Sequence, residues 1–284
     1  MTQQSRAIDQ VIRDLIERLN GERSAPLILG VSGAQGSGKS TLCAELAARL
    51  IALSAPPPLV TILSIDDLYS TRAERRQLGA TVHPLCATRG LPGTHDVALG
   101  LDLLERFRRA QPDQTTLIPR FNKATDERVP QAQFDVVVGR PDLIIIEGWC
   151  VGARPGPTWR GPINEREARD DPDGRYYAWT EAALAGDYQT LWAAFDALLF
   201  IDTPSFETVV AGRCHQERRL AARQQHASAN ERVGVMSEAE VVAYVALFER
   251  LTRRMSRDLP QRATWVVPHW MTSHATGGTS VVSD

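Results

Sequence analysis

The stretch between residues 27 and 50 constrains the fold of this chain more than any other. Its centre reads Gly33-Ala34-Gln35-Gly36-Ser37-Gly38-Lys39-Ser40-Thr41, which fits the P-loop pattern of Gly, four residues, Gly-Lys and Ser or Thr. A short apolar run typical of a buried parallel strand precedes it, and apolar residues at helical spacing follow it. This context favours a phosphate-binding loop over a glycine-rich turn that binds nothing.

The chemistry of this loop follows from its residue types. Gly33, Gly36 and Gly38 allow backbone angles that turn consecutive N–H groups inward, which forms a nest for an anion. The N-terminus of the following helix adds a partial positive charge. We expect Lys39 to contact the β- and γ-phosphates of ATP and the Ser40 hydroxyl to bind Mg²⁺.

Composition excludes several classes of protein. The 284 residues are 43% hydrophobic and 23% charged, as in an ordinary globular protein of one or two domains. The net charge of -2 gives no overall case for nucleic acid or an anionic membrane as a partner, and no apolar run approaches membrane-spanning length. The four cysteines form no Cys-x-x-Cys pair, and the charged N-terminus does not resemble a signal peptide, so we expect a cytoplasmic protein without a zinc site.

Hydrophobic periodicity outlines the other elements. Short apolar runs predict strands that begin near residues 27, 59, 142, 197 and 263. Helical spacing predicts helices over about 5–20, 41–50, 97–109, 176–195, 205–226 and 238–251. Residues from 70 to about 100 look irregular and polar, and residues 154–175 look like an exposed insertion rich in proline, glycine and charge.

These elements predict a three-layer α/β P-loop fold with a mostly parallel five-stranded sheet and helical lid and insertions. We expect one domain over residues 1–284, with its core at 25–270. A substrate-binding insertion would occupy about 70–130, and a lid about 205–232. The Ser/Thr/Gly-rich tail at 272–284 is expected to be loose.

Two predicted strands lead into carboxylates. The strand at 59–65 is followed by Asp66 and Asp67, and the strand at 143–146 is followed by Glu147. Ligands bind at the carboxyl ends of strands in such sheets, so Glu147 occupies a Walker B-like position for supporting Mg²⁺. Asp66 and Asp67 fit a ligand site and a turn or helix cap equally well.

The turn-rich loop at 88–96 carries Arg89, His95 and Asp96. A long loop without periodicity of its own is more often functional than idle. A lone histidine is more often a local hydrogen-bond partner than a ligand, so His95 by itself is weak support. Asp96 or Thr94 could cap the helix that follows.

Clustered cations follow in the segment around residue 122. Asn122-Lys123 invites comparison with the guanine-reading Asn-Lys-x-Asp motif, but Thr125 stands where that motif requires Asp. Arg120, Lys123 and Arg128 could hold an anionic substrate or be solvated charges, and we favour the first.

The predicted helix at 205–226 carries Arg213, Arg218, Arg219 and Arg223. These side chains could form an ordinary solvated face. In a P-loop kinase, a helix at this position closes as a lid over the phosphates, where arginine supplies planar, bidentate contacts.

Several segments together resemble the D-glycerate 3-kinase family, including its bacterial kinase-like members, within the phosphoribulokinase/uridine kinase group of P-loop kinases. The matching stretches are 33–41, 64–69, 89–96, 119–128, 147–152 and 216–217. The Arg-Gly-x-Pro-Gly-Thr-His-Asp and Glu-Gly-Trp stretches are more specific than the P-loop. The chain departs from the family pattern at Asn122, where the family usually shows Asp, and at Gly212, where it often shows Trp.

The resemblance implies phosphoryl transfer from ATP, with Mg²⁺, to a hydroxyl of a small acid, with D-glycerate as the expected acceptor. It implies that Asp66 accepts the proton of the attacking hydroxyl and that Ser40 and Glu147 position the ion. Candidates for substrate binding are Asp66, Tyr69, Arg89, His95, Arg120 and Lys123. Among the candidate catalytic residues, Lys39 would hold the phosphates, and Arg213 and Arg218 would neutralise transition-state charge. A pantothenate- or nucleoside-like acceptor, or a nucleotide-dependent switch, is the alternative. The partner is then a small molecule, without nucleic acid or membrane, and the oligomeric state stays open.

Overall fold

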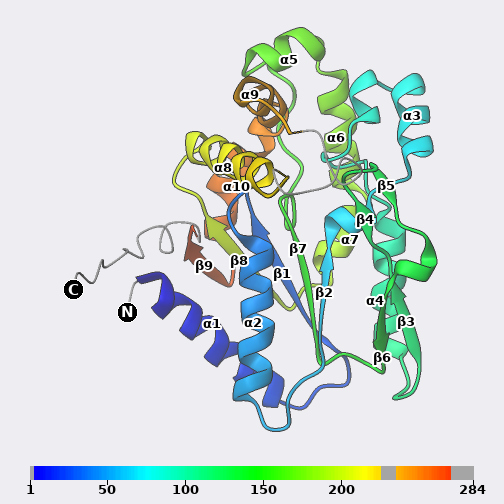
Figure 1. Ribbon diagram of the computed structural model, residues 1–284, viewed down its shortest axis with the longest axis vertical. Helices are drawn as coiled ribbons and strands as arrows, with labels where there is room; N and C mark the ends of the chain where they lie inside the picture. The colour runs from blue at the N-terminus through cyan, green and yellow to red at the C-terminus, as the bar shows by residue number, and fades with distance from the viewer. Residues whose placement is uncertain (1–2, 225–234, 270–284) are drawn as a thin grey trace.

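A parallel five-stranded sheet forms the centre of the computed structural model, which describes residues 3–224 and 235–269 (Figure 1). Its strands, in spatial order, are β2 (Val60–Ser64), β7 (Leu143–Gly148), β1 (Leu27–Gly33), β8 (Ala197–Asp202) and β9 (Trp265–Pro268). Every neighbouring pair is parallel. The predicted α/β class and the five-stranded sheet are confirmed, and each strand begins within two residues of its predicted start.

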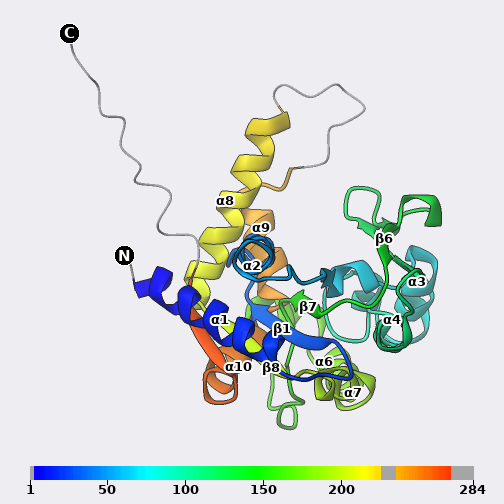
Figure 2. The same cartoon turned by 90° about the horizontal axis from the view of Figure 1, so that it is seen from below.

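Helices cover both faces of this sheet and give the predicted three layers. The helices of the described residues are α1 (Gln3–Asn20), α2 (Lys39–Leu53), α3 (Arg72–Thr81), α4 (Val97–Arg109), α5 (Glu165–Asp170), α6 (Arg175–Ala185), α7 (Asp187–Ala193), α8 (Phe206–Gln224), α9 (Glu238–Ala246) and α10 (Glu249–Asp258), and not all of them lie on the sheet. Figure 2 shows α2 on one side of β1 and β7, and α6 and α7 on the other. No helix in the described part of the chain has the length and apolar content that crossing a bilayer requires.

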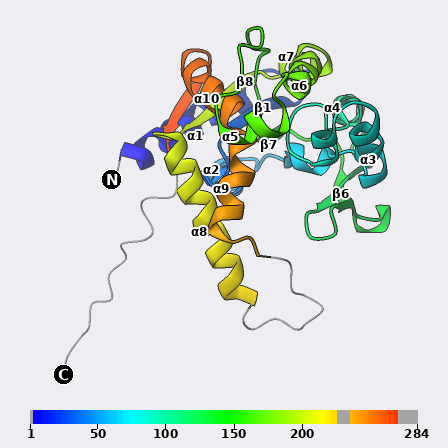
Figure 3. The same ribbon diagram turned by 90° about the horizontal axis from the view of Figure 1, so that it is seen from above.

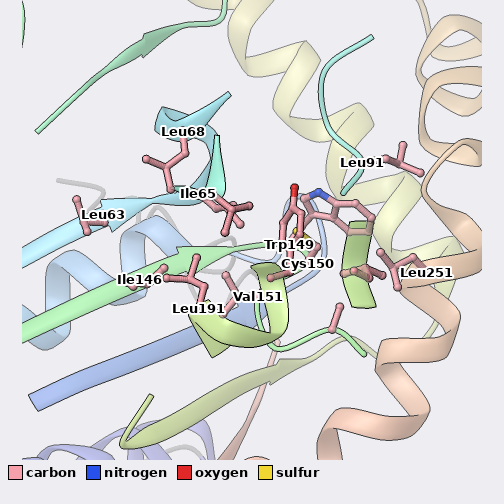
Figure 4. Close-up of a cluster of buried hydrophobic side chains, with 14 of the residues drawn as sticks. Leu63, Ile65, Leu68, Leu91, Ile146, Trp149, Cys150, Val151, Leu191 and Leu251 are labelled. Carbon is pink, nitrogen blue, oxygen red and sulfur yellow. The ribbon is translucent and has the colours of Figure 1, made fainter. Parts of the chain in front are cut away.

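The side chains of β7 alternate between two hydrophobic cores. Leu143 and Ile145 pack with the buried faces of α1 and α2. Ile144 and Ile146 point into the second core, part of which Figure 4 shows around Ile146. Because both faces of a parallel sheet are covered, the strand reads as a continuous apolar run, which explains why it was recognisable in the sequence.

The chain between β2 and β7 forms a group of elements beside the sheet. It contains α3, α4 and two small antiparallel pairs, β3 (Thr115–Ile118) with β6 (Asp135–Val138) and β4 (Phe121–Asn122) with β5 (Glu127–Arg128). Viewed from above, α3, α4 and β6 stay together and apart from α8 and α9 (Figure 3). The hairpin of β4 and β5 brings residues around 123 back toward the end of β2.

The prediction that residues 70–100 are irregular was wrong, because α3 occupies much of their first half. Thr71 caps this helix with a capping box: its side chain accepts from the backbone N–H of Glu74, and the Glu74 carboxylate accepts from the backbone N–H of Thr71. The only buried residue of α3 is Arg75. A helix that buries a cation instead of an apolar stripe has no hydrophobic periodicity to detect.

Other boundaries need smaller corrections. The helix predicted at 176–195 is interrupted at Gly186, and the one predicted at 238–251 divides into α9 and α10. The exposed segment at 154–175 contains the short helix α5. The division into core, substrate-binding insertion and lid stays a prediction. Residues 225–232 of the predicted lid and the tail at 272–284 lie outside the described residues.

Candidate active site

A cleft of about 450 Å³ lies at the carboxyl ends of β1, β2 and β7. The P-loop forms one wall, and the hairpin, α8 and α9 contribute to the others. The predicted site residues that line this cleft are Gln35, Gly36, Lys39, Ser40, Asp66, Tyr69, Arg89, Lys123, Glu147 and Arg213. The structure therefore brings together residues from segments spread over more than half of the chain.

The P-loop has the backbone conformation that an anion nest requires. Gly36 and Gly38 have φ angles of 77° and 85°, a region that side chains disfavour. The Nζ of Lys39 donates to the carbonyl of Ala34 at 2.9 Å, within the same loop. Burial lowers the pKa of Lys39, although nearby carboxylates oppose that shift. The buried Ser37 hydroxyl has no hydrogen-bond partner among the described residues. A curled loop with a buried cation and an unpaired donor fits a polyphosphate.

Ser40 and Glu147 meet beside the P-loop. The Ser40 hydroxyl donates to Oε1 of Glu147 at 3.0 Å, although 107 positions separate the two residues. The parallel register of β1 with β7, which pairs Val31 with Glu147, sets the carboxylate next to the loop. No group of three or more His, Cys, Asp or Glu suited to a metal occurs in the part of the chain that the structure describes. Mg²⁺ commonly uses one or two protein oxygens together with substrate phosphates, so this pair fits that ion.

Asp66 lies in the turn η1 (Ile65–Leu68) directly after β2, with its carboxylate held between two donors. The Oη of Tyr69 donates to Oδ1 at 2.8 Å, and the Nζ of Lys123 donates to Oδ2 at 2.6 Å. Burial by itself would raise the pKa of Asp66, but Lys123 and Tyr69 outweigh it and hold the pKa at about 2. Asp66 is therefore an ionised carboxylate in the cleft wall.

The neighbouring Asp67 has a different task. Its Oδ1 accepts the backbone N–H of Phe121 at 2.9 Å, and its Oδ2 accepts from Nη1 of Arg120 at 2.7 Å. Asp67 thus ties the start of the β4–β5 hairpin to the end of β2. From the sequence, each of the two aspartates could be a ligand-binding group or a cap. The tertiary contacts show that Asp66 presents its carboxylate in the cleft wall, whereas Asp67 holds the hairpin.

Arg120 does not reach the cleft, contrary to its predicted role. Its guanidinium is engaged by Asp67 and, on the far side, by Asp135 of β6. Both of these carboxylates pair with the Arg120 guanidinium. Arg120 therefore serves to attach the β4–β5 hairpin to the end of β2.

His95 is also absent from the cleft lining. Its Nδ1 lies 2.6 Å from Oη of Tyr188, and its ring stacks on Tyr69 with centroids 4.6 Å apart. Burial lowers the pKa of His95 to about 4, so the ring is neutral at pH 7. A neutral, buried ring supports Tyr69 from behind and does not present a charge to a substrate.

The arginines of α8 divide in the same way. Arg213 lines the cleft and pairs with the buried carboxylate of Glu217 one turn later. Arg218 is 69% exposed and 3.8 Å from Glu238, outside the cleft lining. Arg219 is exposed, and no side-chain position is described for Arg223. Helical spacing explains the difference, because positions five residues apart face different sides of a helix.

An aromatic wall completes the cleft, and no site role was predicted for its members from the sequence. The ring of Phe248 contacts both Trp149 and Tyr244, with centroid separations of 5.1 and 5.0 Å. The indole N–H of Trp149 donates to the carbonyl of Gly90 at 2.9 Å. Trp149 belongs to the Glu-Gly-Trp stretch and could have been found from that motif. Tyr244 lies within an ordinary apolar helix pattern and carried no such signal.

No model of a known protein family matches the chain. An uncharacterized kinase of Schizosaccharomyces pombe is 30% identical over 245 residues, which cover 84% of this chain and 83% of that protein. The chloroplastic D-glycerate 3-kinase of Arabidopsis thaliana is 30% identical over 158 residues, which cover 53% of this chain and 34% of that protein.

A likeness of fold extends over nearly the whole chain. The D-glycerate 3-kinase structure from Cryptococcus neoformans superposes with a TM-score of 0.67 at 21% identity. The superposition covers 92% of this chain and 95% of that one. The five-stranded sheet and its helices therefore have a close counterpart among solved structures.

Proposed function

We propose that this chain, which belongs to the D-glycerate 3-kinase family of P-loop kinases, transfers the γ-phosphoryl group of ATP to a hydroxyl of a small organic acid. The acceptor that we propose is D-glycerate, with 3-phosphoglycerate as the product. One observation carries the proposal: an ionised Asp66 shares a single cleft with the P-loop residues Lys39 and Ser40.

The P-loop side of the cleft would hold ATP and Mg²⁺. The ion, when bound, offsets charge on the transferred phosphoryl group. Ser40 and Glu147 offer the two oxygens suited to it. The free N–H groups that the loop and the helix N-terminus offer and the buried ammonium of Lys39 would bind the phosphates, and Lys39 would exchange the Ala34 carbonyl for phosphate oxygen.

Asp66 would act as the base on the acceptor side. Tyr69 donates to one of its oxygens and orients the carboxylate, leaving the second oxygen to accept the hydroxyl proton once Lys123 moves. A carboxylate with a pKa of about 2 is a weak base, so the departure of Lys123 would also strengthen it. The carboxylate of an acid acceptor is the anion that can draw Lys123 away.

Two further cations of the cleft, Arg89 and Arg213, have roles in the proposed reaction. Arg89 lines the cleft and carries a planar guanidinium that can bind a carboxylate through two hydrogen bonds. Arg213 of α8 also lines the cleft, and its charge could offset the negative charge that spreads over the transferred group in the transition state. Positioning and charge stabilisation account for most phosphoryl-transfer catalysis, so no covalent intermediate is needed.

A panel of acceptors tests the proposal. ADP release is measured with ATP, Mg²⁺ and, in turn, D-glycerate, pantothenate, uridine and glycerol. We expect stimulation by D-glycerate, and a reduction of kcat by roughly 10²–10⁴-fold in Asp66→Asn at unchanged ATP affinity. No stimulation by D-glycerate would refute the acceptor, and stimulation by pantothenate or uridine would favour the alternative kinases. ATP turnover that no acceptor stimulates and that survives Asp66→Asn would instead indicate a nucleotide-dependent switch.

A further inference from the structure

A buried arginine lies behind the acceptor side of the cleft. The side chain of Arg75 is 1% exposed, and its guanidinium donates to the carbonyls of Ser70, Ala87 and Asp126 at 3.1, 3.1 and 2.9 Å. These carbonyls belong to the segment after β2, the turn before Arg89, and the β4–β5 hairpin. A buried charge is costly unless its donors are satisfied, so Arg75 fixes the three segments relative to one another.

Asp126 links this buried arginine to Arg89. Its Oδ2 lies 3.0 Å from Nη2 of Arg75, and its Oδ1 accepts from Nη1 of Arg89 at 2.5 Å. Asp126 has a φ of 56°, the one positive value recorded for a non-glycine residue among the described positions. The carboxylate therefore lies in the hairpin turn and pairs with the guanidinium groups of Arg75 and Arg89, and at 3.6 Å with that of Arg72.

The same turn carries Lys123. The side chain of Asn122 accepts the N–H groups of Ala124 and Thr125 at 2.9 and 3.3 Å, which closes the turn between β4 and β5. Asn122 is one of the positions where the chain departs from the family pattern, and its side chain holds the turn without entering the cleft lining. Attachment of Asp126 to Arg75 thus fixes the hairpin that aims Lys123 at Asp66.

Phe121 connects this arrangement to the proposed base. The guanidinium carbons of Arg75 and Arg89 lie 5.8 and 5.9 Å from the centre of its ring. The edge of the ring meets Tyr69 at a centroid distance of 5.1 Å, and Tyr69 donates to Asp66. Arg89 is thereby held at a set place relative to the carboxylate that would accept the proton.

We infer that Arg75 and Asp126 are positioning residues for the acceptor, which act by fixing the direction of Arg89. Neither lines the cleft. Among residues 3–224 and 235–269, Asp126 accepts the only hydrogen bond donated by Arg89, so Asp126 limits the freedom of this long side chain. A guanidinium fixed by one N–H group can offer its others to the acceptor carboxylate in one orientation. The inference rests on the proposed function, because it assumes an acidic acceptor.

The first test is Asp126→Asn, which removes the charge with little change of shape. Asn tolerates a positive φ, so the turn keeps its backbone. We expect the KM for D-glycerate to rise about tenfold, with the KM for ATP unchanged, because only the acceptor side loses its fixed cation. Asp102→Asn is the matched control, since Asp102 pairs with Arg106 at 2.7 Å on the exposed face of α4. Equal effects of the two variants, or equal changes in both KM values, would refute the inference.

A double-mutant cycle separates positioning from general stability. If Asp126 acts through Arg89, Asp126→Asn should add nothing to the acceptor KM of Arg89→Gln, whereas independent effects would multiply and overturn the inference. Should Asp126→Asn fail to fold, Arg75→Lys takes its place in the cycle. This substitution keeps the positive charge but removes the planar guanidinium and its several hydrogen bonds.

A crystal structure of Asp126→Asn gives a readout that needs no acceptor. We expect the Arg89 guanidinium to leave its present place in the cleft wall, and an unmoved Arg89 would overturn the inference. If the parent protein responds to no acid in the acceptor panel, the proposed function fails, and this structure still decides whether Asp126 positions Arg89.

Discussion

The Nζ of Lys123 lies 2.6 Å from Oδ2 of Asp66, although 57 positions separate the two residues in the chain. The lysine side chain is 60% exposed and the aspartate 25%, so the pair is reachable from solvent. Lys123 lies at the tip of the hairpin and can follow an incoming anion, whereas Asp66 is fixed by Tyr69. In the proposed reaction, this pair would keep the base occupied until an acceptor arrives.

This pair predicts a measurable dependence of stability on pH. The folded-state pKa of Asp66, about 2, is below the unfolded value of about 3.9, so its ionised form stabilises the fold above the unfolded value. That contribution is lost as pH falls through about 2. Lys123→Gln should raise the folded-state pKa of Asp66 and so remove part of its contribution to the free energy of unfolding at neutral pH. Urea unfolding of both proteins between pH 2 and pH 7 measures this difference.

The control for that measurement is Arg109→Gln, which removes an exposed cation paired with Glu105 on α4. An exposed pair contributes little, so its free energy of unfolding should follow that of the parent at every pH. Coincident curves for Lys123→Gln and the parent would show that the ion pair does not hold the pKa of Asp66 down.

The contact between the P-loop and α8 predicts opposite outcomes at two glycines. A Cβ on Gly36 would lie 3.0 Å from the backbone carbon of Gly212, at a φ of 77°. Gly36→Ala should therefore cost more than about 1 kcal/mol of stability and weaken ATP binding. A Cβ on Gly212 would lie 3.6 Å from the nearest atom, the Gly36 carbonyl oxygen, so Gly212→Ala should be tolerated. Thermal unfolding and ATP titration compare the stability and the ATP affinity of the two variants. Equal losses in Gly36→Ala and Gly212→Ala would contradict the packing argument.

The hydrogen bond between Ser40 and Glu147 predicts a requirement for a hydroxyl beside the proposed ion. Ser40→Ala should raise the Mg²⁺ concentration for half-maximal activity by about tenfold or more, since even outer partners of a metal contribute about tenfold. Ser40→Thr keeps the hydroxyl and should stay close to the parent. A Mg²⁺ titration at saturating ATP separates the two, and equal Mg²⁺ dependence of Ser40→Ala and Ser40→Thr would exclude the hydroxyl as a ligand.

Arg213 and Arg218 of α8 should differ in their effect on turnover. Arg213 lines the cleft, and Arg213→Ala should lower kcat about a hundredfold if its charge stabilises the transition state. Arg218 lies on the exposed side, so Arg218→Ala should have a far smaller effect. Single-turnover rates with bound ATP give the comparison. A larger loss in Arg218→Ala would mean that α8 turns or moves in the working enzyme.

Much of the sheet and of the nucleotide side was predictable because its signals are local. The P-loop is a contiguous pattern, and β7 is recognisable as four apolar residues followed by Glu147. Parallel strands place their carboxyl ends at one edge, which brings Glu147 to Ser40 without further information.

The acceptor side was predictable in residue type but not in arrangement. Arg120 and Lys123 are three positions apart and equally cationic, yet Arg120 joins Asp67 while Lys123 joins Asp66. Arg75 left no pattern, because a helix that buries one guanidinium lacks the apolar repeat by which helices are recognised.

The sequence by itself therefore determined the α/β fold and the phosphate-binding loop, since these depend on spacing within single segments. Only the tertiary structure decided which polar side chains enter the cleft and which support it from behind. The physical reason is that a charged side chain pairs with the opposite charge that the folded chain brings within hydrogen-bonding distance. For Asp66, Asp126 and their cations, those partners come from segments 37 to 57 positions apart in the sequence.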